Sequence, residues 1–141
     1  MICDSYLVED ETEWRENKMY QGYKSLDVWQ KSMCLVREVY SLIRLMPVDE
    51  RFSLCDQMRR SVVSIPSNIA EGYGRNYKND FLRFLNIARG SKYEIETQIE
   101  ICAMLGYFSL QDAQHALSLC DDVGKMINAL IKKLQSRPEN R

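Results

Sequence analysis

The chain has few of the residues that hold metal ions or exchange protons in pairs. It contains one histidine, His115, no Cys-x-x-Cys pair and no Glu-x-x-His motif of the kind that binds iron in helical bundles. No glycine-rich turn between a strand and a helix is present to hold a phosphate group. Glu71 has no second carboxylate or histidine at a spacing suited to acid–base catalysis. We therefore expect a protein that is not an enzyme, with no catalytic residue, metal, cofactor or small-molecule substrate.

Long apolar runs are also missing. No run approaches the roughly 20 residues needed to cross a bilayer, and the N-terminus is acidic where a secretory signal has a basic start and an apolar centre. The five cysteines are odd in number and widely scattered, so no disulfide framework is expected. These absences predict a cytoplasmic protein that makes no membrane contact.

What the chain does have is the composition of one soluble, helix-rich domain. It has 141 residues, of which 45% are hydrophobic and 28% are charged. The net charge of −1 hides an asymmetry, because residues 1–24 carry six acids against three bases, whereas residues 56–92 carry seven bases against three acids. We expect an acidic N-terminal extension over residues 1–22, a bundle domain over residues 23–135 and a short tail over residues 136–141.

Apolar residues recur every three or four positions in four segments, which predicts four helices and no strand. The expected spans are about 25–45, 49–74, 78–105 and 109–134. Ser25 and Ser109 are the expected N-caps of the first and fourth helices, and Asp112 completes a capping box with Ser109. Because the links are short, successive helices should be antiparallel neighbours in an all-α, up-down-up-down four-helix bundle.

The second helix contains the most unusual motif, the run SIPSNIAEGYGR at residues 64–75. Pro66 has no N–H to donate to the carbonyl of Val62, so we expect a kink there. Ser64, Ser67 and Asn68 suit a small-molecule or partner pocket, but they suit equally well the bonding of backbone groups around the proline, which we favour.

The end of the same motif is also interpreted as structural. Glu71 and Arg75 lie four residues apart and should form an ion pair. Gly72 and Gly74 should stop the helix. Gly90 and Ser91 in the third helix should give a small-residue notch that lets a neighbouring helix approach closely.

Two of the predicted helices are apolar on two sides. The predicted core face of the first helix comprises Leu26, Trp29, Met33, Val36, Tyr40 and Ile43. A helix that is apolar on both sides must be buried on both sides, so the second faces predict a homo-oligomer. The alternative is that loops, or the N-terminal segment with Trp14, Met19 and Tyr20, cover one of them. The predicted oligomer interface comprises Val28, Leu35, Val39, Leu42 and Met46 on the first helix, and Leu119, Val123, Met126 and Leu130 on the fourth.

Several separated motifs together resemble a known family, the four-helix bundle proteins first noticed in intervening sequences of 23S ribosomal RNA genes. The resemblance spans about residues 23–135. The motifs are Tyr23 to Gln30, Leu54 with Gln57, Ser64 to Gly72, Gly74 with Arg75, Phe81, Arg83 to Leu85, Ile87 to Ser91, Glu94, and Leu105 to Tyr107.

The resemblance implies a compact four-helix protomer and a ring-like homopentamer. The resemblance also extends to related proteins, the accessory variability proteins of diversity-generating retroelements, which bind a reverse transcriptase and nucleic acid through a basic surface. This chain departs from those relatives in its net charge of −1, so any polyanion binding should be weaker. It also has Tyr77 where the family usually has a serine cap, which leaves Asn76 or Asn79 to cap the third helix.

The candidate nucleic-acid-binding residues are the basic side chains Arg60, Arg75, Lys78 and Arg83. Tyr73 and Tyr77 are the nearby rings on which a base could stack. The predicted function is a non-enzymatic, homopentameric helical-bundle adaptor associated with RNA, DNA or a nucleic-acid enzyme such as a reverse transcriptase. The alternative is a protein–protein scaffold that makes no nucleic-acid contact.

Overall fold

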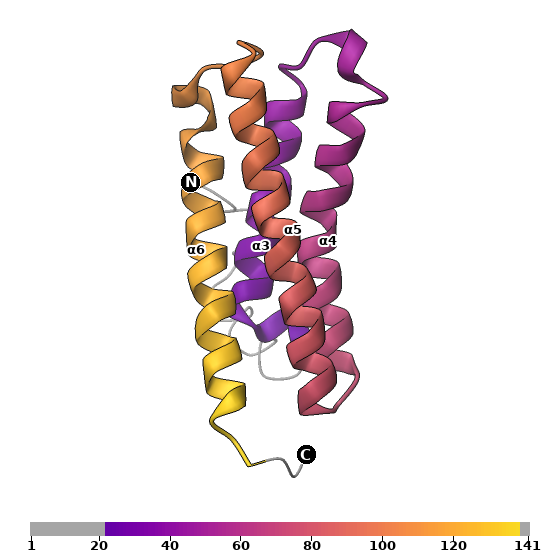
Figure 1. Cartoon of the computed structure of the whole chain (residues 1–141), viewed down its shortest axis with the longest axis vertical. Helices are drawn as coiled ribbons and strands as arrows, with labels where there is room; N and C mark the ends of the chain where they lie inside the picture. The colour runs from indigo at the N-terminus through magenta and orange to yellow at the C-terminus, as the bar shows by residue number, and fades with distance from the viewer. Residues whose placement is uncertain (1–21, 139–141) are drawn as a thin grey trace, which may run out of the picture.

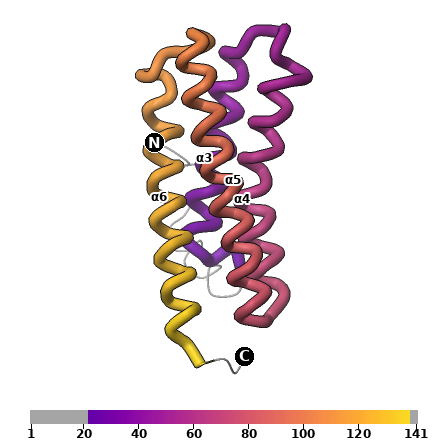
Figure 2. Tube along the Cα trace, in the orientation of Figure 1, coloured from indigo at the N-terminus to yellow at the C-terminus, as the bar shows by residue number. Residues whose placement is uncertain are grey.

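The computed structural model describes residues 22–138, and this part of the chain is entirely helical, with no strand. Figure 1 shows four long helices lying side by side, and Figure 2 shows the same path as a tube. The elements in chain order are the 3-10 turn η1 (Gly22–Ser25), α3 (Asp27–Ile43), the 3-10 turn η2 (Val48–Glu50), α4 (Leu54–Gly74), α5 (Lys78–Met104) and α6 (Leu110–Gln135).

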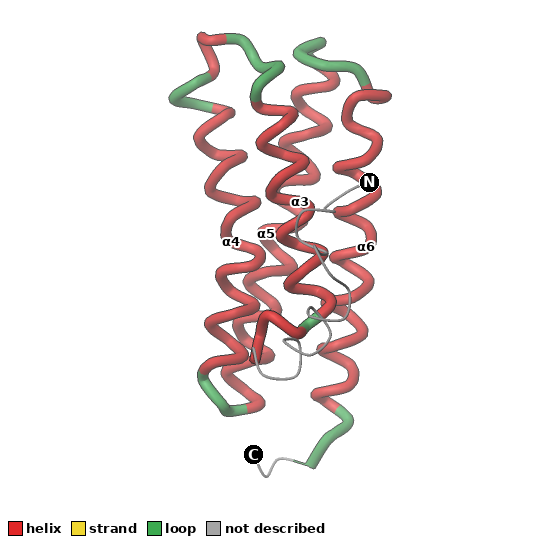
Figure 3. The backbone as a smooth tube through the Cα atoms, turned by 180° about the vertical axis from the view of Figure 1, so that it is seen from behind, coloured by secondary structure: helices red, strands yellow, loops and turns green. Residues whose placement is uncertain are grey.

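Each helix packs against two others. α3 contacts α4 and α6, and α5 contacts the same two helices, with the most extensive contact between α4 and α5. The links from α3 to α4 and from α5 to α6 lie at one end of the bundle, and Figure 3 shows them as loops from behind. We call this the apical end (residues 44–53 and 105–109). The opposite, basal end comprises the α4–α5 link and the end of α6 (residues 72–78 and 134–138).

The core includes residues from both predicted faces of α3, because Trp29 and Ile43 of the predicted core face are buried, and so is most of the opposite face. Leu35 and Val39 are fully buried, whereas Tyr40, which was predicted to lie in the core, is 38% exposed. Met33 and Val36 are only partly buried. Both faces of α3 are apolar, so periodicity alone could not choose between them. The inward face also carries small Ser32, while the outward face carries a tyrosine whose hydroxyl is better left near water.

On α6 the predicted interface residues Leu119 and Val123 belong to one wide core face, because this helix packs against both α3 and α5. Leu119 and Val123 are buried together with Cys120 and Ile127. The predicted oligomer interface is therefore wrong for most of its members, which are buried within the single chain: Val28, Leu35, Val39, Leu42, Leu119 and Val123. Met46, Met126 and Leu130 are partly buried against the core and keep some exposure.

The helix starts confirm one predicted cap and correct two others. Ser109 Oγ accepts from the Asp112 N–H at 3.0 Å and the Asp112 carboxylate accepts from the Ser109 N–H at 3.2 Å, which is the predicted capping box. Ser25 is not a cap, because its hydroxyl donates to the Gly22 carbonyl within η1. The N-cap of α5 is Tyr77 itself, with no side-chain capping bond from Asn76 or Asn79.

The second helix starts later than predicted, because residues 48–50 form the separate turn η2. It then continues through Pro66. The side chains after the proline bond the backbone one turn earlier, as expected: Ser67 Oγ donates to the Val63 carbonyl at 2.8 Å and Asn68 Nδ2 to the Ser64 carbonyl at 2.7 Å.

Gly72 lies inside α4 and does not end it. A Cβ atom at this position would lie 2.6 Å from the Phe84 Cβ, so the glycine allows α4 and α5 to approach closely. Gly90 does not form the predicted notch, because a Cβ atom there would meet nothing within 4 Å.

Three cysteines agree with the expectation of reduced thiols and one does not. Cys55, Cys102 and Cys120 are free and buried, whereas Cys34 is disulfide-bonded. Within residues 22–138, none of the helices combines the length and the apolar character that a membrane crossing requires.

Candidate nucleic-acid interface

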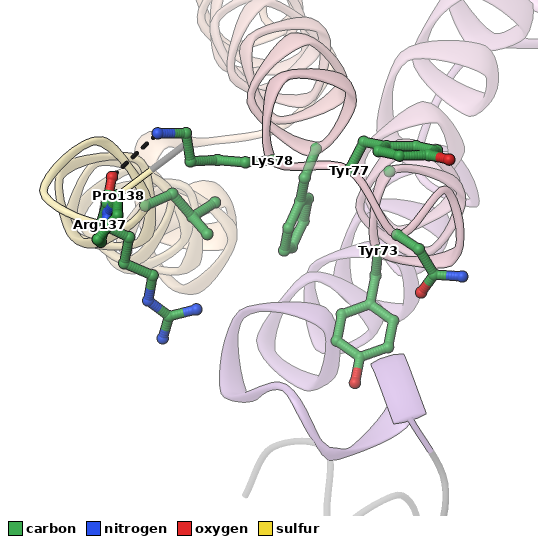
Figure 4. Close-up of a pocket in the computed structure, with 9 residues that line it drawn as sticks. Tyr73, Tyr77, Lys78, Arg137 and Pro138 are labelled. Carbon is green, nitrogen blue, oxygen red and sulfur yellow. Dashed lines mark hydrogen bonds between the residues drawn. The ribbon is translucent and has the colours of Figure 1, made fainter. Parts of the chain in front are cut away.

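The basal end of the bundle contains a cavity of about 630 Å³. It lies where the α4–α5 link meets the residues that follow α6 (Figure 4). The lining residues are Gly72, Tyr73, Asn76, Tyr77, Lys78, Phe81, Leu134, Arg137 and Pro138. We call this space the basal cavity.

Aromatic rings make up much of its wall. The rings of Tyr73 and Phe81 pack edge to face, with centroids 5.9 Å apart and an interplanar angle of 88°. Tyr77 is 69% exposed, so its ring contributes little to the core of the single chain. Asn76 has a positive φ of 65°, in the left-handed region that asparagine tolerates better than most residues, and this conformation turns the chain from α4 into α5.

Cations and no carboxylates line the basal cavity. Lys78 Nζ donates to the Arg137 carbonyl at 3.0 Å, which joins the first residue of α5 to the segment after α6 (Figure 4). The side chains of Lys78 and Arg137 are the charged groups among the lining residues, and both are positive.

Two more cations lie toward the basal end, at the ring of Phe84, which is not among the lining residues. The guanidinium groups of Arg75 and Arg83 lie 5.2 and 4.5 Å from the centroid of the Phe84 ring. Arg75 also forms the predicted ion pair with Glu71 at 3.0 Å. Both partners of this pair are about half exposed, so the pair orients Arg75 more than it stabilises the fold.

Of the four predicted basic residues, Arg75 and Arg83 therefore share the Phe84 ring, and Lys78 lines the basal cavity. Arg60 is not part of this group. It lies about 20 Å from Arg75 along α4, given the rise of a helix. It is 80% exposed and pairs with Asp56 at 2.8 Å.

The polar residues of the proline motif form a seam between α4 and α5. The hydroxyls of Ser64 and Ser91 lie 2.8 Å apart, and Asn68 Nδ2 donates to Ser64 Oγ at 2.8 Å. About one turn before Ser64 on α4, Ser61 Oγ donates to Gln98 Oε1 at 2.7 Å. These groups are used in joining the helices and do not line the basal cavity, which agrees with the structural interpretation of the motif.

Other polar groups in the core have structural partners. Lys92 is 5% exposed, and its ammonium lies 3.3 Å from Glu96 and 4.1 Å from the centroid of the Tyr93 ring. Burial raises the pKa of the Cys102 thiol to about 11 and that of the Cys120 thiol to about 12, so neither is a thiolate nucleophile at neutral pH. Over the described part of the chain, no group of three or more His, Cys, Asp or Glu side chains is placed to hold a metal ion.

Sequence reasoning missed the side of the basal cavity that comes from the C-terminal segment. Leu134, Arg137 and Pro138 were assigned to the end of a helix and to a tail, yet they face the α4–α5 link. The signal was available in the predicted topology, because an even number of antiparallel helices brings the end of the fourth to the same end as the second link.

These observations define an all-α, four-helix bundle with a basic, ring-lined cavity at one end. A family model described as 23S rRNA-intervening sequence protein matches residues 24–129, and the chain belongs to this family. The match covers most of the bundle.

Known proteins give a similar result. A crystal structure of a protein of unknown function from the S23 ribosomal protein family of Bacteroides thetaiotaomicron is similar to this chain, with a TM-score of 0.68 and 26% sequence identity. The similarity covers 74% of this chain and 98% of that one. A search of curated proteins found no match.

Proposed function

We propose that this protein is a cytoplasmic, non-enzymatic adaptor that associates with nucleic acid or with a nucleic-acid enzyme. In this proposal the protomer is an antiparallel up-down-up-down bundle, and copies assemble into a ring-like homopentamer. A ring multiplies a weak site around its axis, so contacts that are poor singly give useful avidity.

The proposal of nucleic-acid association rests on the cations and aromatic rings at the basal end. Arg75, Lys78, Arg83 and Arg137 come from three separate segments and are gathered at one end of the molecule. Phosphate backbones are bound mainly through such charges, and exposed rings such as Tyr77 add stacking with bases. Family membership is consistent with this proposal but names no activity.

Self-association needs a different surface from the one predicted, because most of the predicted interface residues are buried in the core of the single chain. The predicted residues that keep exposure are Met46, Met126 and Leu130. We propose that the outer flank of α6, with Met126 and Leu130, forms the contact between copies.

A mobility-shift series tests nucleic-acid association. The full chain is titrated against structured RNA, single-stranded DNA and duplex DNA over a range of salt concentrations. We expect retention at low salt that weakens as salt rises, because bound counterions are released when phosphates are neutralised. Arg83→Glu should weaken retention more than Arg60→Glu, which makes the same charge change outside the basal group.

Circular dichroism melts check that both variants fold. Absence of retention at the lowest salt for every nucleic acid would refute direct association with nucleic acid. Equal weakening by the two variants would show that binding follows net charge and not the basal end.

A specific observation favours the alternative of a protein–protein scaffold. Large apolar side chains are exposed at the apical end: Leu45, Val48, Phe52, Met104, Leu105 and Leu110. Phe52 is 87% exposed. An exposed apolar group of this kind is typical of protein contact surfaces. The same mobility-shift series distinguishes the two functions, since a scaffold would give no shift.

A further inference from the structure

We propose that the basal cavity binds one unpaired nucleotide of a single strand, with the base against the ring of Tyr77 and the phosphate at Lys78 and Arg137. This inference rests on the proposed association with nucleic acid and narrows it to a form of nucleic acid and to a site.

The size of the cavity fits one small ligand. Its volume of about 630 Å³ falls inside the range of roughly 300–1,000 Å³ that is usual for small-molecule sites. One unit of a strand fits such a space, whereas a groove would be required for a run of stacked bases.

The rings are available for stacking. Tyr77 is the most exposed tyrosine among the described residues and is one of the lining residues, with its side chain directed to the opposite side from that of Lys78 (Figure 4). Tyr73 also lines the cavity and is 39% exposed. Every base has a flat face that stacks on such a ring without requiring a particular sequence.

The cations suit a phosphate. The Lys78 ammonium has three donors, and one of them is directed at the Arg137 carbonyl. A guanidinium such as that of Arg137 binds phosphate through paired N–H groups. The absence of carboxylates among the lining residues means that an anion meets no like charge in the cavity wall.

The arrangement favours a single strand over a duplex. In a duplex the flat faces of the bases are stacked on one another inside the helix, so the Tyr77 ring would have no base face to stack on. In a single strand one base can turn into the cavity while the neighbouring phosphates pass Arg75 and Arg83 beside Phe84.

The test measures affinity by fluorescence anisotropy with the full chain. The probes are a labelled short oligouridylate and the same strand paired with its oligoadenylate complement. We expect Tyr77→Ala to weaken binding of the single strand by roughly tenfold, as is typical for loss of one stacking ring, and to change duplex binding little. Tyr77→Phe should retain the affinity, because the ring remains.

Matched variants control for general effects. Tyr93→Ala removes a tyrosine that is 54% exposed on α5 but lies outside the cavity, and it should leave the affinity unchanged. Lys78→Gln should weaken binding of the single strand more than Lys125→Gln, which removes the same charge from an exposed position of α6.

A second measurement locates the site without a strand. Uridine 5′-monophosphate and inorganic phosphate are titrated separately while amide resonances are followed by NMR. We expect the nucleotide to shift the amides of Tyr73, Tyr77 and Lys78, and phosphate alone to shift Lys78 without Tyr73.

The outcomes separate this inference from the proposed function. If oligonucleotides bind but Tyr77→Ala has no effect, nucleic-acid association stands and the cavity proposal is overturned. If the nucleotide shifts the basal amides but no strand binds, the cavity is a site for a free nucleotide, and both strand binding at the cavity and nucleic-acid association are overturned. If neither binds, both are overturned.

Discussion

At the scale of single residues, two glycines of similar appearance in the sequence have opposite roles. Gly72 lies where α4 meets α5, and an added Cβ would lie 2.6 Å from the Phe84 Cβ and 3.1 Å from the Phe81 ring. Gly90 lies in α5, where an added Cβ would have open space. The sequence suggested a helix stop at the first and a close approach at the second, because the register between α4 and α5 is not visible in either helix alone.

This contrast predicts opposite effects on stability. Gly72→Ala should lower the free energy of unfolding by about 1–3 kcal/mol, the usual cost of overpacking, because a backbone-fixed Cβ cannot move aside. Gly90→Ala should raise it by about 0.5–1 kcal/mol, the difference in helix propensity between the two residues. Urea unfolding followed by circular dichroism measures both. A stabilised Gly72→Ala variant would contradict the contact between α4 and α5 described above.

At the scale of elements, features set by residues close together in the chain could be predicted from the sequence. Features set by packing between helices could not. The Ser109 and Asp112 box was found from the sequence because both partners lie in one turn. The inward face of α3 was not, because Tyr40 and Val39 are neighbours in the chain and only the positions of α4 and α6 decide which is buried. Whether a helix forms depends on the pattern of its own residues, whereas which of its side chains are buried depends on the helices that pack against it.

The capping box predicts a measurable contribution from one hydroxyl. Ser109→Ala should lower the free energy of unfolding by about 1 kcal/mol, since the N–H of Asp112 loses its acceptor. Ser136→Ala is the matched control. Its hydroxyl donates to the Lys133 carbonyl at the other end of α6, in an exposed position where water can replace it. Equal losses in the two variants, measured by thermal or urea unfolding, would mean that the box contributes nothing specific.

At the scale of the whole molecule, the number and order of helices followed from the sequence, but the site at the basal end did not follow completely. Arg75, Lys78, Tyr73 and Tyr77 were identified because they lie close together around one link. Arg137 was not, because it is separated from its partner Lys78 by 59 residues in the chain. The same limit applies to the predicted interface, whose residues had the apolar character of a contact surface but are used within the chain.

Assembly provides the last prediction. If copies meet along the outer flank of α6, Met126→Gln combined with Leu130→Gln should lower the mass measured by light scattering from that of a pentamer toward that of one chain. These side chains are partly buried, so the two substitutions remove apolar contact without emptying the core. Phe52→Gln combined with Met104→Gln changes two highly exposed side chains at the apical end and should leave the mass unchanged. A wild-type chain that stays a single subunit at micromolar concentration would refute self-association, and loss of assembly only in the apical pair would move the contact to that end.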